Sequence, residues 1–198
     1  MTSTLGSALL ASAGGERVSI LLGLEPAYPS AHVLGPAFTV QGAPGDNLAL
    51  HWAVSVAAPG DVIVLAVGGE QQVAHCGDII ARAARERGVA GIVFDGAVRD
   101  RAEIARLELP VFHLGTSPRG PGKQGPGALR VPVELRGVRV EHGDLVCADS
   151  DGIAIVRRDE AEIVVAAAAA LEAREQEIVA AIERGESTVR IFDLKELP

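Results

Sequence analysis

Aromatic side chains are scarce in this sequence. Four Phe, one Trp and one Tyr make up the whole aromatic content of 198 residues. The core must therefore be aliphatic and alanine-rich, and few rings remain for stacking against bases. Basic side chains are also in deficit, with 18 Lys and Arg against 26 Asp and Glu and a net charge of -8. A protein that binds the phosphate backbone needs the opposite balance, so we expect no nucleic-acid partner.

Cysteine is nearly absent as well. Cys76 and Cys147 are the only two, and neither belongs to a C-x-x-C pair. Two isolated thiols favour a reduced, cytoplasmic protein over a disulfide framework. The opening stretch MTSTLGSALLASAGG lacks the basic start and long apolar run of a signal peptide. No window approaches the roughly 18 uninterrupted apolar residues of a membrane span, so we expect a cytoplasmic location and no membrane partner.

Several familiar catalytic and binding motifs are missing. No G-x-S-x-G elbow occurs, which disfavours a serine hydrolase. The segment Gly120–Gly125 spells G-x-G-x-x-G, but prolines surround it and a strand rather than a helix is expected after it, so it does not predict a dinucleotide site. His75 and Cys76, with His113, His142 and Cys147 as distant partners, match no zinc spacing. We interpret these residues as buried thiols and surface imidazoles.

The hydrophobic pattern predicts one α/β domain, because 48% of the residues are hydrophobic and 22% are charged. Strands alternate with helices in the first half, which indicates a buried, locally parallel sheet. Asp78 is the expected N-cap of one helix, and Gly88 lies past its end. Helices are expected at 3–12, 47–57, 79–87 and about 100–107, and strands at 33–40 (interrupted by Gly35-Pro36), 61–67, 91–94 and 110–114.

The second half differs from the first in composition and in predicted secondary structure. A Pro/Gly-rich loop occupies 115–130, and short strands follow within 131–156, which we expect to form an antiparallel, barrel-like half. Asp159 and Glu162 predict a capping box for a last helix that ends at Gly185. Its apolar residues recur at helical spacing, at Ile163, Val164, Ala167, Leu171, Ile178 and Ile182. We divide the chain into a domain at 1–158 and a C-terminal helix and tail at 159–198.

Acids and one arginine gather after two of the predicted strands. Successive parallel crossovers share one hand, so the loops at 67–78 and 95–100 should open on the same sheet edge, where ligands tend to bind. Glu70, Asp78, Asp95, Arg99 and Asp100 can therefore converge. Carboxylates suit a hard cation such as Mg²⁺ or Mn²⁺, arginine suits a carboxylate, and helix amides suit an anion. Together these groups indicate a site for a small 2-oxo acid.

A structural interpretation of the same residues stays open. In that interpretation Asp95 caps a turn, Arg99 pairs with Asp100, and Asp78 only caps its helix. Spacing does not decide between the two readings.

A resemblance to a known family favours the active-site interpretation. The segments GDNLALHWAVSVAAPGDVIVL, CGDII, GVAGIVFDGAVRD, PVF and HGDLVCADSDGIAIV follow one another in this order. They resemble the RraA-like superfamily, which includes 4-hydroxy-4-methyl-2-oxoglutarate aldolases and regulators of RNase E activity. The resemblance covers about 3–156, with a weaker echo in the last helix. It implies an αββα-type fold, a homotrimer or hexamer, and a C-terminal helix that extends to a neighbouring subunit.

The resemblance also implies roles for individual residues. Asp100 would ligate Mg²⁺ or Mn²⁺, and Arg99 would hold the substrate carboxylate. Asp78 would order a metal-bound water, while Gly77 and the amides of Ile79 and Ile80 would bind the substrate. Either Glu175 or Glu177 of a neighbouring subunit would reach the metal through water. The sequence departs from the aldolases just before the helix-opening G-D, where it carries His75-Cys76 rather than an aromatic or aliphatic residue.

The predicted function is a metal-dependent lyase that cleaves 4-hydroxy-2-oxo acids to pyruvate, with oxaloacetate decarboxylation as a side activity. A Schiff-base aldolase is disfavoured because Lys123 is the only lysine outside the tail. The alternative is a non-catalytic member that binds and regulates an RNA-degrading enzyme. The regulators lack the motif's second aspartate and are short at the C-terminus, whereas this chain has Asp100 and a C-terminal helix.

Overall fold

A large mixed β-sheet forms the centre of the molecule in the computed structural model, which describes residues 5–195. Its strand order is β1-β14-β13-β3-β4-β6-β8-β2, and β10 also pairs with β3. The parallel strands β3, β4, β6 and β8 form the expected parallel unit. The bounds of these strands are β1 Val18–Leu21, β2 Glu25–Pro26, β3 Val33–Gln41, β4 Val62–Ala66, β6 Gly91–Phe94, β8 Val111–His113, β10 Ala128–Leu129, β13 Leu145–Asp149 and β14 Gly152–Val156.

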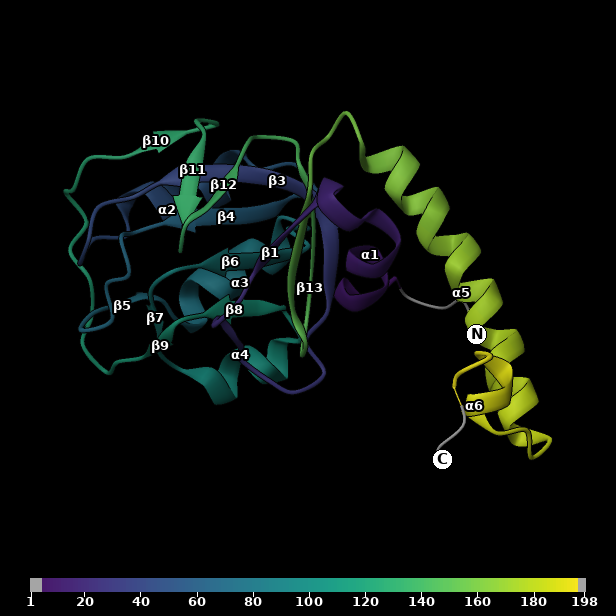
Figure 1. Ribbon diagram of the computed structural model, residues 1–198. Coiled ribbons are helices and arrows are strands. Elements are labelled where there is room, and N and C mark those ends of the chain that lie inside the picture. Colours follow the sequence, from purple (N-terminus) through teal and green to yellow (C-terminus); the bar gives the residue numbers. More distant parts are fainter. Residues whose placement is uncertain (1–4, 196–198) are drawn as a thin grey trace.

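Alternation along the parallel strands divides the core between the two faces of the sheet. Phe38, Ile63 and Phe94 pack under three helices, α2 (Leu48–Val56), α3 (Asp78–Glu86) and α4 (Arg101–Leu107). Val64 and Phe112 lie in a second cluster with the hairpin of β11 (Val133–Leu135) and β12 (Val138–Val140). Because successive strand side chains point to opposite faces, a strand of only Val, Ile, Leu and Ala can serve both clusters. Figure 1 shows the helices on one side of the sheet and the hairpin on the other.

The predicted helices of the first half are confirmed, with two corrections. Helix α1 (Ser7–Gly14) lies later than the expected 3–12, of which residues 3 and 4 fall outside the described part of the chain. Asp78 is the first residue of α3, not its cap: Gly77 holds the N-cap position and no side chain caps this helix. Gly88 does follow the helix, with a φ of 76°.

Strand β3 runs without a break through Gly35 and Pro36, so the expected interruption is wrong. These two residues pair with Val146 and Leu145 of β13. Glycine is required at position 35 because a Cβ there would lie 2.4 Å from the carbonyl oxygen of Gly60. The close approach of a loop, rather than a turn, explains this glycine. Strands β13 and β14 are antiparallel as predicted, but they extend the parallel strands instead of forming a separate barrel.

Helix α5 (Ala161–Glu183) leaves the body of the molecule. Only Val164 and Ala168 of this helix are buried, where its first turns pack against α1. Figure 1 shows the rest projecting from the sheet, with α6 (Thr188–Ile191) beside its far end. Apolar side chains remain exposed along it, including Ile163, Val179 and Ile182. The helix predicted from the spacing of apolar residues is therefore confirmed, but within one chain only a small part of its apolar surface is buried.

The predicted capping box of α5 is wrong. Glu160 is the N-cap and accepts no side-chain capping bond, while the Asp159 carboxylate pairs with Arg157. Gly185 follows the helix with a φ of 91°, as expected. Among the described residues, no helix combines the length and apolarity needed to cross a membrane.

Two acids of the predicted cluster serve the fold. Asp95 is buried, and its carboxylate accepts the backbone N–H of Val67 at 2.6 Å and of Gly69 at 2.9 Å. It therefore holds the loop that follows β4. Glu70 accepts the N–H of Gln72 at 2.5 Å within the same loop. For Asp95 the turn-capping interpretation is the one that the structure supports.

Replacing Asp95 should destabilise the fold. Asp95→Ala leaves two loop amides without their acceptor, and a lost hydrogen bond to a charged group costs about 1.5–3 kcal/mol, so we expect a loss of roughly 3 kcal/mol in the free energy of unfolding. Asp61→Ala is the matched control, because Asp61 also accepts a backbone N–H, that of Ala58 at 2.8 Å, but in an exposed turn. Urea denaturation measures both, and equal losses would contradict the role assigned to Asp95.

Candidate functional site

The candidate site is built on a small sheet that links the loops after β4, β6 and β8. Strands β5 (Ala74–Cys76), β7 (Ala97–Val98) and β9 (Gly115–Thr116) pair in parallel in the order β5-β7-β9. The Arg99 N–H donates to the Cys76 carbonyl at 3.0 Å, and the Ser117 N–H donates to the Val98 carbonyl at 3.1 Å. The loops are thus fixed against one another, and Gly77 lies beside Arg99 and Asp100. All three strands lie in segments that the sequence pattern predicted to be loops or turns.

Gly77 allows the charged groups to approach the helix N-terminus. A Cβ at position 77 would lie 2.7 Å from Asp100 Oδ2 and 3.0 Å from Arg99 Cγ. The Asp78 N–H donates to Asp100 Oδ2 at 3.3 Å, and Arg99 Nε lies 3.5 Å from the same oxygen. The structure therefore brings Gly77, Asp78, Arg99 and Asp100 together, as the sequence predicted. It also shows the pairing of Arg99 with Asp100 that the structural interpretation proposed.

The backbone of Asp100 adopts a left-handed conformation, with φ 57° and ψ 38°. For a residue other than glycine this conformation costs about 1 kcal/mol. Asp100 occupies the N-cap position of α4, yet its side chain caps nothing there and turns instead to the amide of Asp78. About 38% of the side chain is exposed. The Asp100 carboxylate is thus held beside the start of α3 and stays partly open to solvent.

The first turn of α3 offers backbone donors to the same place. The Ala81 N–H donates to the Gly77 carbonyl, so the amides of Ile79 and Ile80 precede the first helical hydrogen bond. The Asp78 side chain pairs with Arg82, one turn further on, at 3.3 Å. Each acid of the site thus has its own arginine neighbour, and the repulsion expected between the carboxylates is offset. Free amides at a helix N-terminus favour a bound anion.

Two hollows meet at Arg99. The smaller, of about 100 Å³, is bordered by Asn47, His51, Ile79, Ile80, Arg99 and Lys123. The larger, of about 510 Å³, is bordered by Arg99, Asp100, Arg101, Thr116 and Ser117. Arg99 and Lys123 give the smaller hollow two cations. The smaller hollow therefore carries positive charge, and Asp100 borders the larger one.

Three residues that border the smaller hollow, Asn47, His51 and Lys123, were not predicted from the sequence. Lys123 Nζ lies 3.5 Å from Asn47 Oδ1, and Asn47 in turn donates to the His75 carbonyl at 3.0 Å. Burial, and then the charge of Lys123, lower the pKa of His51, so its ring is neutral at neutral pH. The Gly120–Gly125 segment is followed by β10 rather than a helix. This segment brings Lys123 to the hollow. Lys123 is the only lysine outside the tail, and this was the one feature of the sequence that could have marked it as a site residue.

The histidines near the site are more buried than predicted, whereas Cys76 is buried as expected. His75 and His113 are fully buried, so their interpretation as surface imidazoles is wrong. Burial, and then Arg101, lower the pKa of His113 to about 4. Burial, and then the Asp100 carboxylate, raise the pKa of the Cys76 thiol to about 12. These groups stay uncharged at neutral pH and do not supply a nucleophile or a cation.

Glu175 and Glu177 are far from Asp100 within one chain. Both are exposed on the projecting part of α5. Figure 1 shows β5, β7 and β9 at one end of the molecule and α5 at the other. A glutamate from this helix reaches a site of this kind only if it belongs to another copy of the chain.

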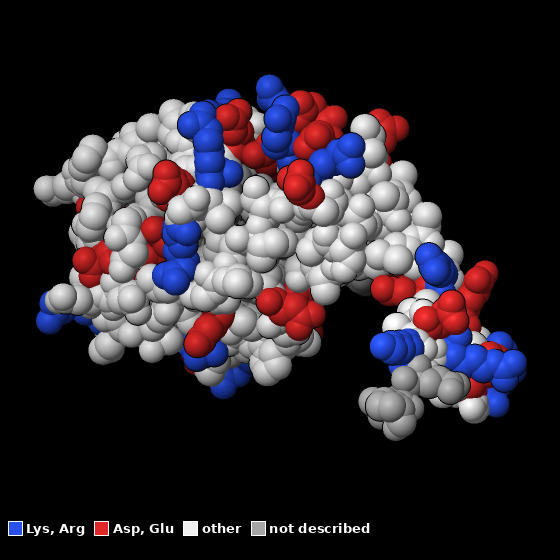
Figure 2. All heavy atoms as spheres, viewed as in Figure 1, with Lys and Arg blue, Asp and Glu red and all other residues white. Residues whose placement is uncertain are grey.

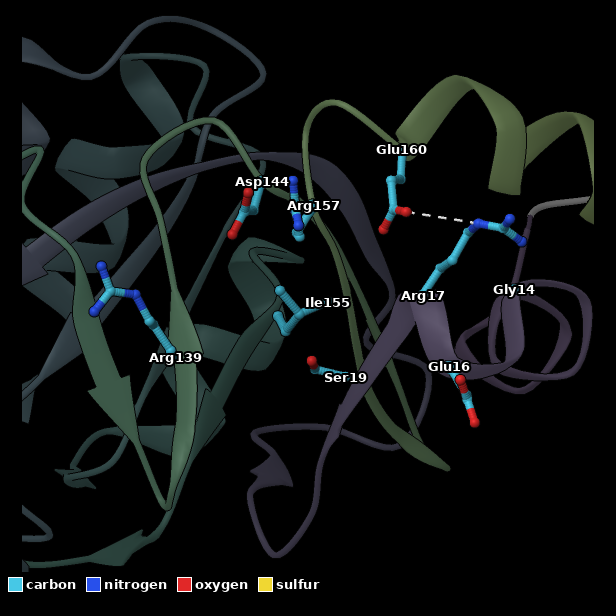
Figure 3. A pocket seen from close by; sticks show the side chains of 9 residues that line it. All are labelled: Gly14, Glu16, Arg17, Ser19, Arg139, Asp144, Ile155, Arg157 and Glu160. Carbon is cyan, nitrogen blue, oxygen red and sulfur yellow. Dashed lines mark ion pairs between the residues drawn. The ribbon is translucent and has the colours of Figure 1, made fainter.

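A further hollow, of about 600 Å³, is lined by charged residues from both ends of the chain (Figure 3). Arg17 faces Glu160 there at 3.6 Å, and Arg139 and Arg157 pair with Glu141 and Asp159. Figure 2 shows acidic and basic side chains interleaved over this part of the surface. Each arginine of this hollow already has an acid beside it, so the hollow offers no unpaired arginine to an anionic ligand.

Comparison with known proteins agrees with the fold and shows the family. A family model described as RraA-like, Aldolase/RraA, matches residues 5–155. A protein of Halalkalibacterium halodurans named "Putative 4-hydroxy-4-methyl-2-oxoglutarate aldolase" is 36% identical over 169 residues, which are 85% of this chain and 80% of that protein.

Two solved structures share the fold. An uncharacterized protein from Pseudomonas syringae has a TM-score of 0.81 at 29% identity, over 92% of this chain and 90% of that one. Streptomyces coelicolor RraAS2, described as an unusual member of the RNase ES inhibitor RraA protein family, has a TM-score of 0.74 at 32% identity, over 88% of this chain and 90% of that one. The chain therefore belongs to the RraA-like family.

Proposed function

We propose that this protein is a divalent-metal-dependent aldolase that cleaves 4-hydroxy-2-oxo acids and releases pyruvate. The observation that carries the proposal is the convergence of Arg99, Asp100 and the first amides of α3 at the junction of two hollows. The relative from Halalkalibacterium halodurans, whose name describes an aldolase, supports the reaction class. A panel of 4-hydroxy-2-oxo acids, assayed for pyruvate release with and without Mg²⁺ or Mn²⁺, tests it.

The chain's own residues account for substrate binding. Arg99 would grip the C1 carboxylate at two points, because its planar guanidinium matches a carboxylate. The amides of Ile79 and Ile80 would donate to the same end of the substrate. Lys123 adds a second positive charge to the smaller hollow and suits a substrate with more than one carboxylate, such as 4-hydroxy-4-methyl-2-oxoglutarate.

The donor set fits Mg²⁺ or Mn²⁺. Asp100 would hold the ion directly and Asp78 through a water, and both side chains are partly exposed. Within residues 5–195, no third acid, imidazole or thiol joins them in a close group. One or two carboxylates suffice for Mg²⁺, which keeps several of its waters. A bound ion would supply Lewis-acid stabilisation of the negative charge that develops on the 2-oxo oxygen.

Cleavage would proceed by proton removal and bond breaking. A water held by Asp78 would take the proton of the 4-hydroxyl group, and the C3–C4 bond would break with its electron pair left on the three-carbon fragment. The fragment is pyruvate enolate, which becomes pyruvate when a proton is added at C3. Loss of carbon dioxide from oxaloacetate leaves the same enolate, so oxaloacetate decarboxylation is the expected side activity.

A second candidate function comes from the similarity to Streptomyces coelicolor RraAS2, whose description concerns inhibition of an RNase. A protein that only binds an RNA-degrading enzyme needs neither Arg99 nor a strained acid at position 100. Pyruvate release that depends on both residues would separate the two functions.

We also propose that the active site is shared between copies of the chain in a homotrimer or hexamer. The division into a domain at 1–158 and an arm at 159–198 belongs to this proposal. Its support is that α5 buries only two of its residues and carries Glu175 and Glu177 away from its own Asp100.

Arg99→Lys should weaken catalysis although it keeps the charge. A lysine cannot reproduce the two-point grip on a carboxylate, so we expect a loss of roughly 2 kcal/mol, or about 30-fold in kcat/KM. Arg106→Lys is the control, because Arg106 pairs with Glu103 on the exposed side of α4. Kinetics of Arg99→Lys within about twofold of the parent would make Arg99 a structural residue.

Asp100→Asn should abolish metal-dependent turnover while leaving the fold nearly unchanged. The amide removes the charge that holds a hard cation, and asparagine tolerates the left-handed backbone. The exposed pair with Arg99 is worth at most about 1 kcal/mol. Asp100→Gly removes the carboxylate and also relieves the backbone strain, so it should be inactive and at least as stable. Metal titration, pyruvate release and thermal melting of the metal-free protein check this, and Mg²⁺-dependent turnover in either variant would refute the role of Asp100.

Subunit complementation tests the shared site. Either Glu175→Gln or Glu177→Gln should lose most activity, whereas the exposed Glu183→Gln should retain it. Whichever of Glu175→Gln and Glu177→Gln is inactive should recover activity when it is co-expressed with Asp100→Asn. Some mixed sites would then contain an intact Asp100 from one chain and an intact glutamate from the other. No recovery, or a monomer of 20.4 kDa by light scattering, would contradict the proposal.

A further inference from the structure

A second group of ligand-type side chains lies away from the candidate site. The His32 imidazole, the Cys147 thiol and an Asp149 carboxylate oxygen lie within 4.8 Å of one another. His32 directly precedes β3. Cys147 and Asp149 lie in the last three residues of β13, where Ala148 pairs with Val33. This is the amino end of β3, whereas Arg99 and Asp100 lie beyond the carboxyl ends of the parallel strands. The group is therefore separate from the aldolase site.

Two polar hydrogens of this group converge on one oxygen. His32 Nε2 lies 2.9 Å from the Leu5 carbonyl oxygen, and the Cys147 thiol donates to the same oxygen at 3.3 Å. His32 Nε2 and Cys147 Sγ are 3.9 Å apart. The imidazole nitrogen, the sulfur and the carbonyl oxygen thus face a common point. A cation placed there would replace both hydrogens.

Asp149 is held as metal-ligating carboxylates usually are. Its oxygens accept the Ser7 N–H at 2.7 Å, the Ser7 hydroxyl at 2.6 Å and the Asp151 N–H at 3.0 Å. Hydrogen bonds of this kind orient a carboxylate. Oδ1 accepts two of them, whereas Oδ2 accepts only the Ser7 N–H and keeps a lone pair for a cation. Ser7 opens α1, so the same bonds tie the N-terminal segment to the sheet.

We propose that His32, Cys147 and Asp149, with the Leu5 carbonyl as a fourth donor, bind Zn²⁺. Nitrogen, sulfur and oxygen donors in a set of four are the ligands that tetrahedral zinc takes. Zinc needs ligand atoms about 3.5 Å apart. The three side-chain atoms lie within 4.8 Å of one another, so they must close by at most about 1.3 Å, while the Leu5 oxygen must move slightly away from His32 Nε2. The thiolate and the carboxylate neutralise the two charges of the ion in a partly buried place.

Proton balance follows from the chemistry of the ligands. The Cys147 thiol loses its proton as the Zn–S bond forms. The His32 ring stays neutral, because its proton moves from Nε2 to Nδ1 when Nε2 binds the ion. One proton is released for each zinc bound. The ion would fasten α1, on which α5 packs, to the ends of β3 and β13.

The test uses the full chain with Asp100→Asn, so that the aldolase site does not take the added metal. This protein, treated with a chelator, should bind about one equivalent of Zn²⁺, release one proton and melt at a higher temperature. Its Co²⁺ complex should show the thiolate-to-metal charge-transfer band. Mg²⁺ should have no such effect, because a thiol and an imidazole do not suit a hard cation.

Added ligand variants assign the site. His32→Gln and Cys147→Ser should each weaken Zn²⁺ binding by about 100-fold or more, since even residues that only orient a ligand are worth 10–100-fold. Cys76→Ser, which alters the other buried thiol, should leave binding and the Co²⁺ band intact. If Cys147→Ser does not fold, the half-buried His32→Gln and the Co²⁺ spectrum still decide. Absence of Zn²⁺ uptake, absence of the thiolate band, or loss of the band in Cys76→Ser would overturn the proposal. The group would then only connect the N-terminal segment to the sheet by hydrogen bonds.

Discussion

The close approach of the Gly77 backbone to Asp100 and Arg99 is the contact on which the rest of the candidate site depends. Any side chain at position 77 would overlap the Asp100 carboxylate, and the parallel pairing of β5 with β7 and of β7 with β9 holds the loops at this distance. The approach places an acid in a strained backbone conformation beside the free amides of a helix. Rigid loops at the carboxyl edge of a parallel sheet then present an arginine, an acid and helix amides to one small volume.

The acids near this edge separate into two kinds by burial and by bonding partner. Asp95 is buried, and each of its oxygens accepts one loop amide, so it stabilises the loop that carries the site. Asp78 and Asp100 remain partly exposed beside arginines, and neither is consumed by capping a helix. An acid that is partly open to solvent at the rim of a hollow can bind a cation or a water, whereas Asp95 is enclosed by the loop that it holds.

The two ends of the chain meet at α1. This helix packs against the first turns of α5, while its Ser7 is bonded to Asp149 at the end of β13. The orientation in which α5 leaves the molecule therefore depends on how firmly α1 is held. A helix that is apolar along much of its length and exposed beyond its first turns has more surface to bury than its own chain covers.

Most of the secondary structure and the core of the candidate site were readable from the sequence. Runs such as VIVLA and GIVF can only be buried strands, and the constant hand of parallel crossovers places their loops on one edge. Asp78, Arg99 and Asp100 were found this way and through the family motif. The short strands β5, β7 and β9 were missed because strands of two or three residues have no pattern of their own.

Tertiary structure alone decided which residues far apart in the sequence share a site. Lys123 reaches the hollow beside Arg99 because the Pro/Gly loop folds back to Asn47 at the start of α2, and the loop and α2 then border the hollow together. His32 meets Cys147 through the antiparallel pairing of β3 with β13, a partner 115 positions away. Local sequence determines helices, strands and turns, because these depend on neighbours along the chain. Contacts between strands depend on register and on glycines such as Gly35 and Gly77, whose role is defined by the atoms that approach them.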